Sequence, residues 1–279
     1  MELTAQDVAR FFPKRDKNAH KGSFGKLLLL CGSRGFTGAP YFAAMGALRV
    51  GAGLVYLGVP ESIYGIEAVK LNEPVIFPLP ESGGQLSAEA VPEILERLPR
   101  MDALLIGPGL GLNPGCFRVL QAVLTHAACP VVVDADGITL LSGHMDLLRG
   151  REAPTVLTPH AGEFARVFGP VGQDPMASAR QAARESGSIV LLKGHRTCVT
   201  DGTRDYRNPT GNPGMAVGGS GDVLAGILTG LLGQGFEPLE AAAVGAWLHG
   251  RAGDLCAEAL GEYGMLPTDL LGYLPRLLK

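Results

Sequence analysis

Short apolar runs alternate with longer segments of helical spacing along nearly the whole chain. The runs are apolar throughout, as expected for strands that are covered on both faces of a sheet. We expect strands at Lys26–Cys31, Leu54–Val59, Ala103–Ile106, Val131–Val133, Thr155–Leu157 and Ile189–Leu192. We expect helices near Pro40–Val50, Ser62–Val69, Ala88–Leu98, Cys116–Ala127, Gly162–Phe168, Met176–Ser186, Ser220–Leu232 and Leu239–Ala259. This alternation predicts a three-layer α/β fold, with a mainly parallel central sheet and helices on both faces.

The composition fits such a fold and excludes several classes of function. We find no linker, repeat or low-complexity tract, and we expect residues 1–279 to form a single domain. The 40 glycines follow no G-X-Y period, which favours many tight strand-to-helix turns. The formal net charge of −3 gives no electrostatic reason to expect binding to nucleic acid or to an anionic membrane.

Two further features indicate where the protein works. The five cysteines lack CxxC spacing, so neither a disulfide framework nor a zinc site is indicated, and a reducing compartment is expected. The N-terminal residues do not form a secretory signal, and the longest aliphatic runs are too short to span a bilayer. We therefore expect a soluble, cytoplasmic protein.

Glycine together with polar residues follows five of the predicted strands. Because ligands bind outside the carboxyl ends of strands in open parallel sheets, these strand ends predict one shared cleft. The segments are Gly32–Gly38, Gly107–Gly111, Asp134–Gly137, Thr158–Glu163 and Lys193–Thr197.

The glycine-rich stretch Gly211–Asp222 runs directly into a predicted helix. Its glycines lack Cβ atoms, so the backbone can turn sharply and approach a ligand. The first N–H groups of a helix have no internal partner and favour an anion such as phosphate. A carboxylate at Asp222 fits this place if it is a general base that takes a proton from a hydroxyl attacking phosphorus. The loop alone fits a plain tight turn equally well, because acidic residues are common in first helical turns.

Other polar residues of the cleft allow two interpretations each. Asp134 and Asp136 could bind Mg²⁺; we favour Asp136 as the cap of a short helix over Gly137–Leu141 and leave Asp134 open. His160 is either a structural hydrogen-bonding residue or a contact for a polar substrate. Lys193 and Arg196 either meet phosphates or form an ordinary basic turn between the strands Ile189–Leu192 and Cys198–Thr200.

Taken in order, these residues strongly resemble the ADP-dependent NAD(P)H-hydrate dehydratase family, which belongs to the ribokinase-like superfamily. Each matching piece is weak alone, but the ordered set is specific and covers nearly the full chain. The pieces are His20–Gly25, Thr37–Ala39 with Gly51–Leu54, Gly107–Gly111, Asp134–Asp136, Leu157–Glu163, Leu192–Gly194 and Gly211–Asp222.

The resemblance implies a ribokinase-like fold and a carbon–oxygen lyase. Such an enzyme dehydrates (6S)-NADHX or NADPHX to NADH or NADPH and converts ADP to AMP and phosphate. The matching positions imply a catalytic base at Asp222 and an anion hole at Gly218–Gly221, with Gly219 and Gly221 as catalytic residues. They imply nucleotide binding by Lys193, Gly194, His195, Arg196, Thr197 and Gly221, and binding of the hydrated cofactor by Ala39, Gly109, His160 and Asp222.

The resemblance also implies ADP as co-substrate, Mg²⁺ with the nucleotide phosphates through ligands that the sequence does not identify, and a homotetramer. Many bacterial relatives carry an epimerase domain in front of this one, so we expect a separate NAD(P)H-hydrate epimerase to work alongside this chain. A small-molecule kinase of the same superfamily, of the thiazole or hydroxymethylpyrimidine type, is one alternative. A non-catalytic nucleotide sensor is another. Thr158–His160 with Gly107–Gly111 favours the dehydratase over the kinase, and Asp222 argues against the sensor, which needs no base.

Overall fold

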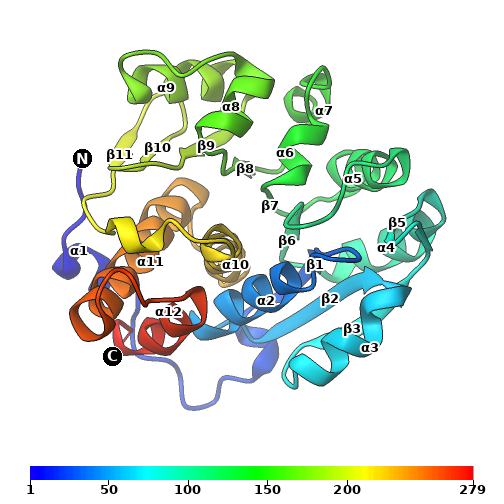
Figure 1. The fold of residues 1–279 in the computed structure, drawn as a ribbon, viewed down its shortest axis with the longest axis horizontal. Coiled ribbons are helices and arrows are strands. Elements are labelled where there is room, and N and C mark those ends of the chain that lie inside the picture. Colours follow the sequence, from blue (N-terminus) through cyan, green and yellow to red (C-terminus); the bar gives the residue numbers. More distant parts are fainter. Residues whose placement is uncertain (279) are drawn as a thin grey trace.

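A nine-stranded sheet runs through the centre of the computed structural model, which describes residues 1–278 (Figure 1). The strand order is β11-β10-β9-β8-β7-β6-β1-β2-β3, and the strands from β3 through β9 are parallel to their neighbours. The strands β10 and β11 pair in antiparallel fashion. The bounds are β1 Lys26–Leu30, β2 Leu54–Pro60, β3 Val75–Leu79, β6 Ala103–Ile106, β7 Val131–Val133, β8 Thr155–Leu157, β9 Ile189–Leu192, β10 Cys198–Thr200 and β11 Asp205–Arg207. A separate two-stranded ribbon joins β4 Glu81–Ser82 to β5 Gln85–Leu86.

Helices cover both faces of the sheet. Their bounds are α1 Ala5–Ala9, α2 Gly38–Arg49, α3 Glu61–Lys70, α4 Val91–Arg97, α5 Pro114–His126, α6 Asp136–Leu140, α7 Asp146–Arg149, α8 Ala161–Phe168, α9 Pro175–Ser186, α10 Ser220–Gly233, α11 Pro238–Leu260 and α12 Pro267–Tyr273. Every strand and helix expected from the apolar pattern has a counterpart within a few residues, including the β9–β10 pair. The prediction of a three-layer α/β fold is confirmed.

The strands β3 and β11 were not predicted, because both form edges of the sheet and neither is a continuous apolar run. In β3, Pro78 interrupts the run and exposed residues alternate with buried ones, which is tolerated at an edge. The strand β11 consists of Asp205, Tyr206 and Arg207, and none of them is fully buried. Polar residues on an edge strand discourage pairing with other chains.

Alternate residues of β1 divide the core into two clusters. Leu27 and Leu29 pack in one cluster with apolar residues of α2, α10 and α11. Leu28 and Leu30 face the other way and pack with α4, α5 and α9. Since successive side chains of a strand point to opposite faces, a run of four leucines in β1 serves both layers.

The helices α2 and α10 pack so closely that their backbones nearly touch. A Cβ atom at Gly226 would lie 2.1 Å from the carbonyl oxygen of Ala43, and one at Gly46 would lie 2.5 Å from the carbonyl oxygen of Val223. Four residues further along both helices, a Cβ atom at Gly230 would again lie 2.9 Å from a carbonyl oxygen of α2. The two helices therefore run in the same direction, and both begin at the carboxyl edge of the sheet.

Gly226→Ala is expected to lower the free energy of unfolding by about 1–3 kcal/mol, because the added methyl group forces the two helices apart. Thermal and urea unfolding would measure the change. Gly272→Ala is the matched control, since that α12 glycine is exposed and a Cβ atom there would meet nothing within 4 Å. The control should keep or slightly raise the stability. Equal stability of both variants would contradict close packing at Gly226.

Candidate active site

The start of α10 forms a backbone cradle at the carboxyl edge of the sheet. Its N-cap residue is Gly219, whose φ of 98° lies in the left-handed region. A Cβ atom at Gly219 would lie 2.6 Å from the ring of Phe42 on α2, so both the turn and the packing need glycine here. Because the cap has no side chain, it offers no acceptor to the first N–H groups of the helix, which suit an anion instead.

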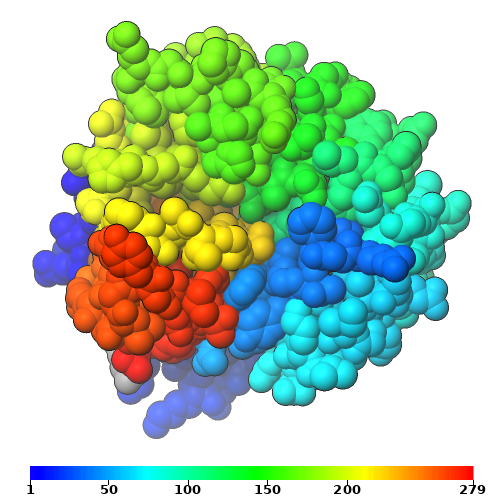
Figure 2. All heavy atoms as spheres, viewed as in Figure 1, coloured from blue at the N-terminus to red at the C-terminus, as the bar shows by residue number. Residues whose placement is uncertain are grey.

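Segments that are far apart in the sequence meet around this cradle. In the space-filling view, the glycine-rich loop in yellow lies between blue residues that follow β1 and green residues of the middle of the chain (Figure 2). The segments that follow the strands therefore come together here, as expected for the shared cleft. Its chemistry follows from the side chains that these segments contribute.

Asp222 occupies the first turn of α10, as the sequence indicates. Burial raises the pKa of its carboxyl group to about 7, and the charge of Asp134 adds to this rise, whereas the charge of Lys193 opposes it. A carboxyl group with this pKa is partly ionised near neutral pH. It can therefore both accept and release a proton, which is the property that a general base needs.

Lys193 brings a cation to the same place. Its Nζ donates a hydrogen bond of 2.8 Å to Oδ1 of Asp134 and lies 3.7 Å from Oε2 of Glu163. A Cβ atom at Gly221 would lie 3.5 Å from this Nζ, so the ammonium group sits beside the first turn of α10. Burial acts to lower the pKa of Lys193, but the charges of Asp134 and Glu163 outweigh it and raise the pKa. Lys193 therefore stays protonated, and its positive charge acts on Asp222.

The structure shows which protein groups Asp134 contacts, and its binding of Mg²⁺ stays open. Its carboxylate is buried and accepts from both Lys193 and Thr158, whose Oγ1 lies 2.7 Å from Oδ1. This carboxylate binds a lysine and a hydroxyl group. Across residues 1–278, no group of three or more His, Cys, Asp or Glu side chains is placed to hold a metal ion.

The prediction that Asp136 caps a helix over Gly137–Leu141 is wrong. The helix α6 begins at Asp136 itself, and its N-cap is Ala135, with a φ of 49°. The Asp136 carboxylate instead accepts a hydrogen bond of 2.8 Å from the N–H of Gly111. It holds the loop after β6 because that loop lies directly beside the start of α6.

His160 has the structural role that the sequence allows. It is the N-cap of α8, where its Nδ1 accepts from the N–H of Gly162 at 2.9 Å, and Glu163 completes the capping box. Its Nε2 lies 3.4 Å from Oε1 of Glu163, but the side chain is 55 % exposed, so one edge of the ring faces the solvent. The structural interpretation is confirmed, and the substrate contact stays a prediction.

Ala39 and Gly109 lie side by side: Ala39 is in the first turn of α2, which follows β1, and Gly109 is on the loop after the neighbouring strand β6. A Cβ atom at Gly109 would lie 3.1 Å from that of Ala39 and 2.9 Å from that of Phe36. Ser33 ties the two loops together through a hydrogen bond of 2.8 Å to the carbonyl oxygen of Gly109. The structure thus brings together two of the residues expected to bind the hydrated cofactor, next to the exposed ring of Phe36.

The predicted nucleotide-binding residues divide into two groups. The side chain of Lys193 reaches Asp134 in the cleft, whereas Gly194, His195 and Arg196 form the exposed β9–β10 turn. Arg196 has a positive φ of 59°, and its guanidinium group pairs with the carboxylate of Glu2. Thr197 closes the turn with a hydrogen bond of 3.1 Å to the carbonyl oxygen of Gly194. Only Lys193 therefore belongs to the buried charge cluster.

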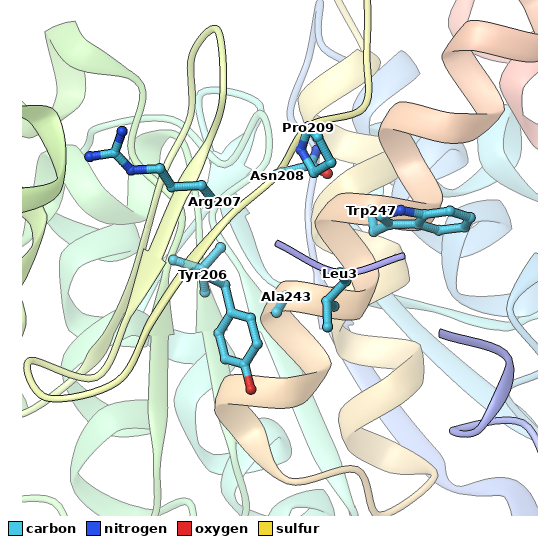
Figure 3. Close-up of a pocket in the computed structure, with 8 residues that line it drawn as sticks. Leu3, Tyr206, Arg207, Asn208, Pro209, Ala243 and Trp247 are labelled. Carbon is cyan, nitrogen blue, oxygen red and sulfur yellow. The ribbon is translucent and has the colours of Figure 1, made fainter. Parts of the chain in front are cut away.

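A small cavity of about 10 Å³ lies elsewhere, between Leu3, β11 and Trp247 of α11 (Figure 3). This volume is about that of one water-sized probe, so the cavity cannot hold a nucleotide base. It has no residue in common with the cluster around Asp222.

Several residues of the site were missed from the sequence alone. Thr158 and Glu163 lie within a segment that was assigned to the cleft, and their partners could not be assigned before the fold was known. Phe42, which packs on Gly219, lies in an ordinary apolar helix. The hydrogen bond between Ser220 and His249 carries no local signal, because it joins residues of two different helices.

Comparison with known proteins identifies the family of this chain. The family model described as NAD(P)H-hydrate dehydratase matches residues 27–276. The chain belongs to this family. The resemblance found in the sequence is thereby confirmed, and so is membership of an enzyme family.

Relatives and solved structures cover the whole chain. A bifunctional NAD(P)H-hydrate repair enzyme of Moorella thermoacetica is 45 % identical over 284 aligned positions, which are 99 % of this chain and 53 % of that protein. An ADP-dependent (S)-NAD(P)H-hydrate dehydratase of Cenarchaeum symbiosum is 35 % identical over 98 % of this chain and 95 % of its own length. The chain thus spans about half the length of the bifunctional relatives.

The structure of an ADP/ATP-dependent NAD(P)H-hydrate dehydratase from Bacillus subtilis, co-crystallised with ATP and Mg²⁺, superposes with a TM-score of 0.86. It is 30 % identical, and the match covers 99 % of this chain and 96 % of that one. The expected ribokinase-like fold is therefore confirmed. Among the described residues, no helix is long and apolar enough to cross a membrane.

Asp222→Asn is expected to raise stability near pH 8 by on the order of 1–3 kcal/mol. An acid whose pKa is higher in the folded than in the unfolded protein holds its proton more tightly when folded. The free energy of unfolding therefore falls as pH rises from about 4 to about 7, and is level above that. The neutral asparagine variant does not lose stability in this way, so its stability relative to the parent protein should grow from about pH 4 to about pH 7. Thermal unfolding from pH 4 to pH 8 measures it.

Asp201→Asn is the control of opposite sign. Burial acts to raise the pKa of Asp201, but hydrogen bonds from Arg204 and Thr203 outweigh it and hold the pKa below its usual range. Removing this carboxylate should lower stability at neutral pH. If Asp222→Asn destabilises the protein at pH 8 as Asp201→Asn does, the claim that burial raises the pKa of Asp222 is refuted.

Proposed function

We propose that this protein is an ADP-dependent NAD(P)H-hydrate dehydratase, which converts (6S)-NADHX or NADPHX to NADH or NADPH while ADP becomes AMP and phosphate. One observation carries the proposal: a carboxyl group with a pKa of about 7 stands in the first turn of α10, beside the ammonium group of Lys193. The names of the relatives from Moorella and Cenarchaeum support the substrate and the use of ADP.

In the first step, Asp222 takes the proton of the substrate hydroxyl as its oxygen attacks the β-phosphorus of ADP. The new O–P bond forms while the bond to the bridging oxygen breaks, and AMP leaves. Negative charge develops on the phosphoryl oxygens, where the amides of Gly219 and Gly221 and the Lys193 ammonium group can stabilise it. The protein supplies mainly position and charge.

In the second step, the phosphate leaves with the electron pair of the C–O bond. The nitrogen of the reduced nicotinamide ring supplies electrons to expel it, and loss of a proton from the neighbouring carbon restores the ring double bond. Phosphorylation is needed because hydroxide is a poor leaving group and phosphate is a good one. The oxygen of the water removed from the substrate ends in the phosphate, and its two protons, one taken by Asp222 and one lost from the ring carbon, pass to the products and the solvent.

We place Ala39, Gly109 and His160 at the hydrated cofactor, and Lys193 to Thr197 with Gly221 at the nucleotide. The adjacency of Ala39 and Gly109 and the exposed edge of His160 support the first group. The position of Lys193 beside Gly221 supports the second. Arg196 would exchange the carboxylate of Glu2 for a phosphate when a nucleotide binds.

Mg²⁺ is proposed to arrive with the nucleotide phosphates. The described residues fit a dedicated protein site poorly, because Asp134 and Glu163 already face Lys193 and no three-ligand cluster is present among residues 1–278. Mg²⁺ usually keeps several waters and binds through substrate phosphates together with one or two carboxylates. The co-crystallisation of the Bacillus subtilis protein with ATP and Mg²⁺ supports this nucleotide complex.

The remaining expectations concern the setting of the reaction. We propose that residues 1–279 act as one domain, which the continuous nine-stranded sheet supports. We propose a separate NAD(P)H-hydrate epimerase as functional partner, in view of the bifunctional names of the longer relatives. The homotetramer rests on the family resemblance, and the cytoplasmic location rests on the five cysteines, which lack CxxC spacing.

The purified protein is expected to restore the near-ultraviolet absorbance of reduced nicotinamide when it is given hydrated NADH, Mg²⁺ and ADP, with one AMP formed per NADH. ATP in place of ADP tests the nucleotide preference. Phosphorylated vitamin precursors, formed from ATP without recovery of NADH from its hydrate, would identify a small-molecule kinase instead. Tight nucleotide binding without turnover would identify a sensor.

Asp222→Asn is expected to lower kcat by about 10²–10⁴-fold and to change the affinity for ADP by no more than a few-fold, since it removes proton acceptance and little else. Steady-state kinetics and calorimetric titration with ADP measure the two quantities. Asp201→Asn should leave both unchanged. A loss of ADP binding as large as the loss of kcat would show that Asp222 is structural.

Lys193→Gln is expected to move the acid limb of the pH profile of kcat above pH 7. The charge of Lys193 lowers the pKa of Asp222, so removing it lets burial and Asp134 raise that pKa further. Arg204→Gln, which removes a cation paired with Asp201 and Glu237, is the charge-matched control and should leave the limb in place. If the acid limb of the kcat profile of Lys193→Gln does not shift, the ammonium group of Lys193 does not act on the catalytic base.

A further inference from the structure

The helix α11 holds the chain segment that leads into the cradle. The side-chain amide of Asn208 donates to the carbonyl oxygen of Ala246 at 3.0 Å, and Thr210 Oγ1 donates to that of Trp247 at 3.0 Å. These bonds fix the start of the segment on two neighbouring carbonyl oxygens of α11. Since α11 is buried against the sheet over most of its length, it offers a rigid surface for this attachment.

The same face of α11 continues with two glycines and an aspartate. The carboxylate of Asp254 accepts from the N–H of Gly211 at 3.2 Å and from Nδ2 of Asn212 at 3.1 Å. A Cβ atom at Gly250 would lie 2.2 Å from Thr210, and one at Gly253 would lie 2.3 Å from Met215. The loop before the cradle therefore lies directly on the helix surface.

The last of these contacts reaches the cradle itself. Nε2 of His249 lies 3.2 Å from Oγ of Ser220, the residue between Gly219 and Gly221. Both side chains are buried, with 6 % of Ser220 and 9 % of His249 exposed, so the hydroxyl group is not placed to attack a ligand. Burial lowers the pKa of His249 to about 4, and the charge of Lys193 adds to this effect. A neutral ring makes one hydrogen bond to Ser220 in either tautomer.

We propose that His249 is a positioning residue: through Ser220 it aims the amides of Gly219 and Gly221 at the phosphoryl group that is transferred. Glycine has little conformational preference of its own, so the cradle depends on outside contacts for its shape. Donors that stabilise a transition state must be held within about 0.5 Å of their working positions. The inference rests on the proposed function, because it gives the cradle a phosphoryl group to bind.

Two substitutions separate positioning from plain core packing. Glutamine can place a polar atom near the position of Nε2, whereas asparagine reaches only as far as Nδ1. Both are neutral and polar, so both meet the same buried surroundings. His249→Asn should leave the Ser220 hydroxyl without its partner, and His249→Gln should restore the contact.

We expect His249→Asn and Ser220→Ala each to lower kcat by about 10–100-fold and to change KM for ADP by less than about 3-fold. His249→Gln should stay within a few-fold of the parent kcat. The double variant His249→Asn with Ser220→Ala should be no slower than His249→Asn alone, because both changes break one contact. Thr229→Val, which removes a buried α10 hydroxyl that bonds to Ala225, is the control and should keep the parent kcat.

Calorimetric binding of inorganic phosphate gives the same comparison without turnover. His249→Asn should weaken it by about 10-fold, and His249→Gln should keep it within about 3-fold. The proposal is overturned if glutamine and asparagine have equal kcat and equal phosphate affinity at equal melting temperature, or if the two single losses multiply in the double variant.

The failure of the proposed function looks different. In that case the parent protein would show no turnover of hydrated NADH, or Asp222→Asn and Ser220→Ala would leave that turnover unchanged. The phosphate titration would still measure anion binding by the cradle. If only the role of His249 is wrong, Ser220→Ala lowers kcat and His249→Asn does not.

Discussion

The ion pair between Lys193 and Asp134 is the interaction on which the site depends. The carboxyl groups of Asp134, Glu163 and Asp222 lie in one buried region. Their mutual repulsion would favour the protonated forms of these groups if no cation were present. The ammonium group of Lys193 lies within 2.8 Å of one carboxylate and 3.7 Å of another, and it also lowers the pKa of Asp222. It thereby keeps the base available near neutral pH without giving it a fixed partner.

The order of the strands explains how these charges meet. Asp134 follows β7, Glu163 stands just beyond β8 and Lys193 follows β9, which are three neighbouring parallel strands. The pairing of β8 with β9 continues beyond the strands, since the N–H of Lys193 donates to the carbonyl oxygen of Pro159 at 2.8 Å. Asp222 reaches the same region from the first turn of α10, which packs on one face of the sheet. A parallel sheet thus converts positions some thirty residues apart into one cluster.

Much of this arrangement could be predicted from the sequence, because it depends on repeated local signals. Continuous apolar runs identify strands that are buried on both faces, and parallel strands place their carboxyl ends together. The cleft and the place of Asp222 follow from these two rules. The edge strands β3 and β11 were not predicted, because Pro78 interrupts the apolar run of β3 and β11 is mostly polar.

The individual hydrogen bonds could not be predicted in the same way. Asp136 has the residue type and position of a helix cap, yet its carboxylate bonds to Gly111, 25 residues earlier in the chain. His249 stands in an apolar helix and finds its partner 29 residues away. Such partners depend on how loops and helices pack after the strands are in place. Sequence spacing therefore predicts the residues that share a cleft better than the atoms that they contact.

The close contact of α2 with α10 has a consequence for how the cleft can move. Ala39 stands at the start of one helix and Asp222 at the start of the other, and near-touching backbones along Gly46, Gly226 and Gly230 lock the two together. In the proposed reaction, this wall of the cleft would act as a single body that carries both a substrate contact and the proton acceptor. For the proposed dinucleotide substrate, an opening would then come from the opposite wall, where β9 ends in the exposed turn that Gly194, His195 and Arg196 form.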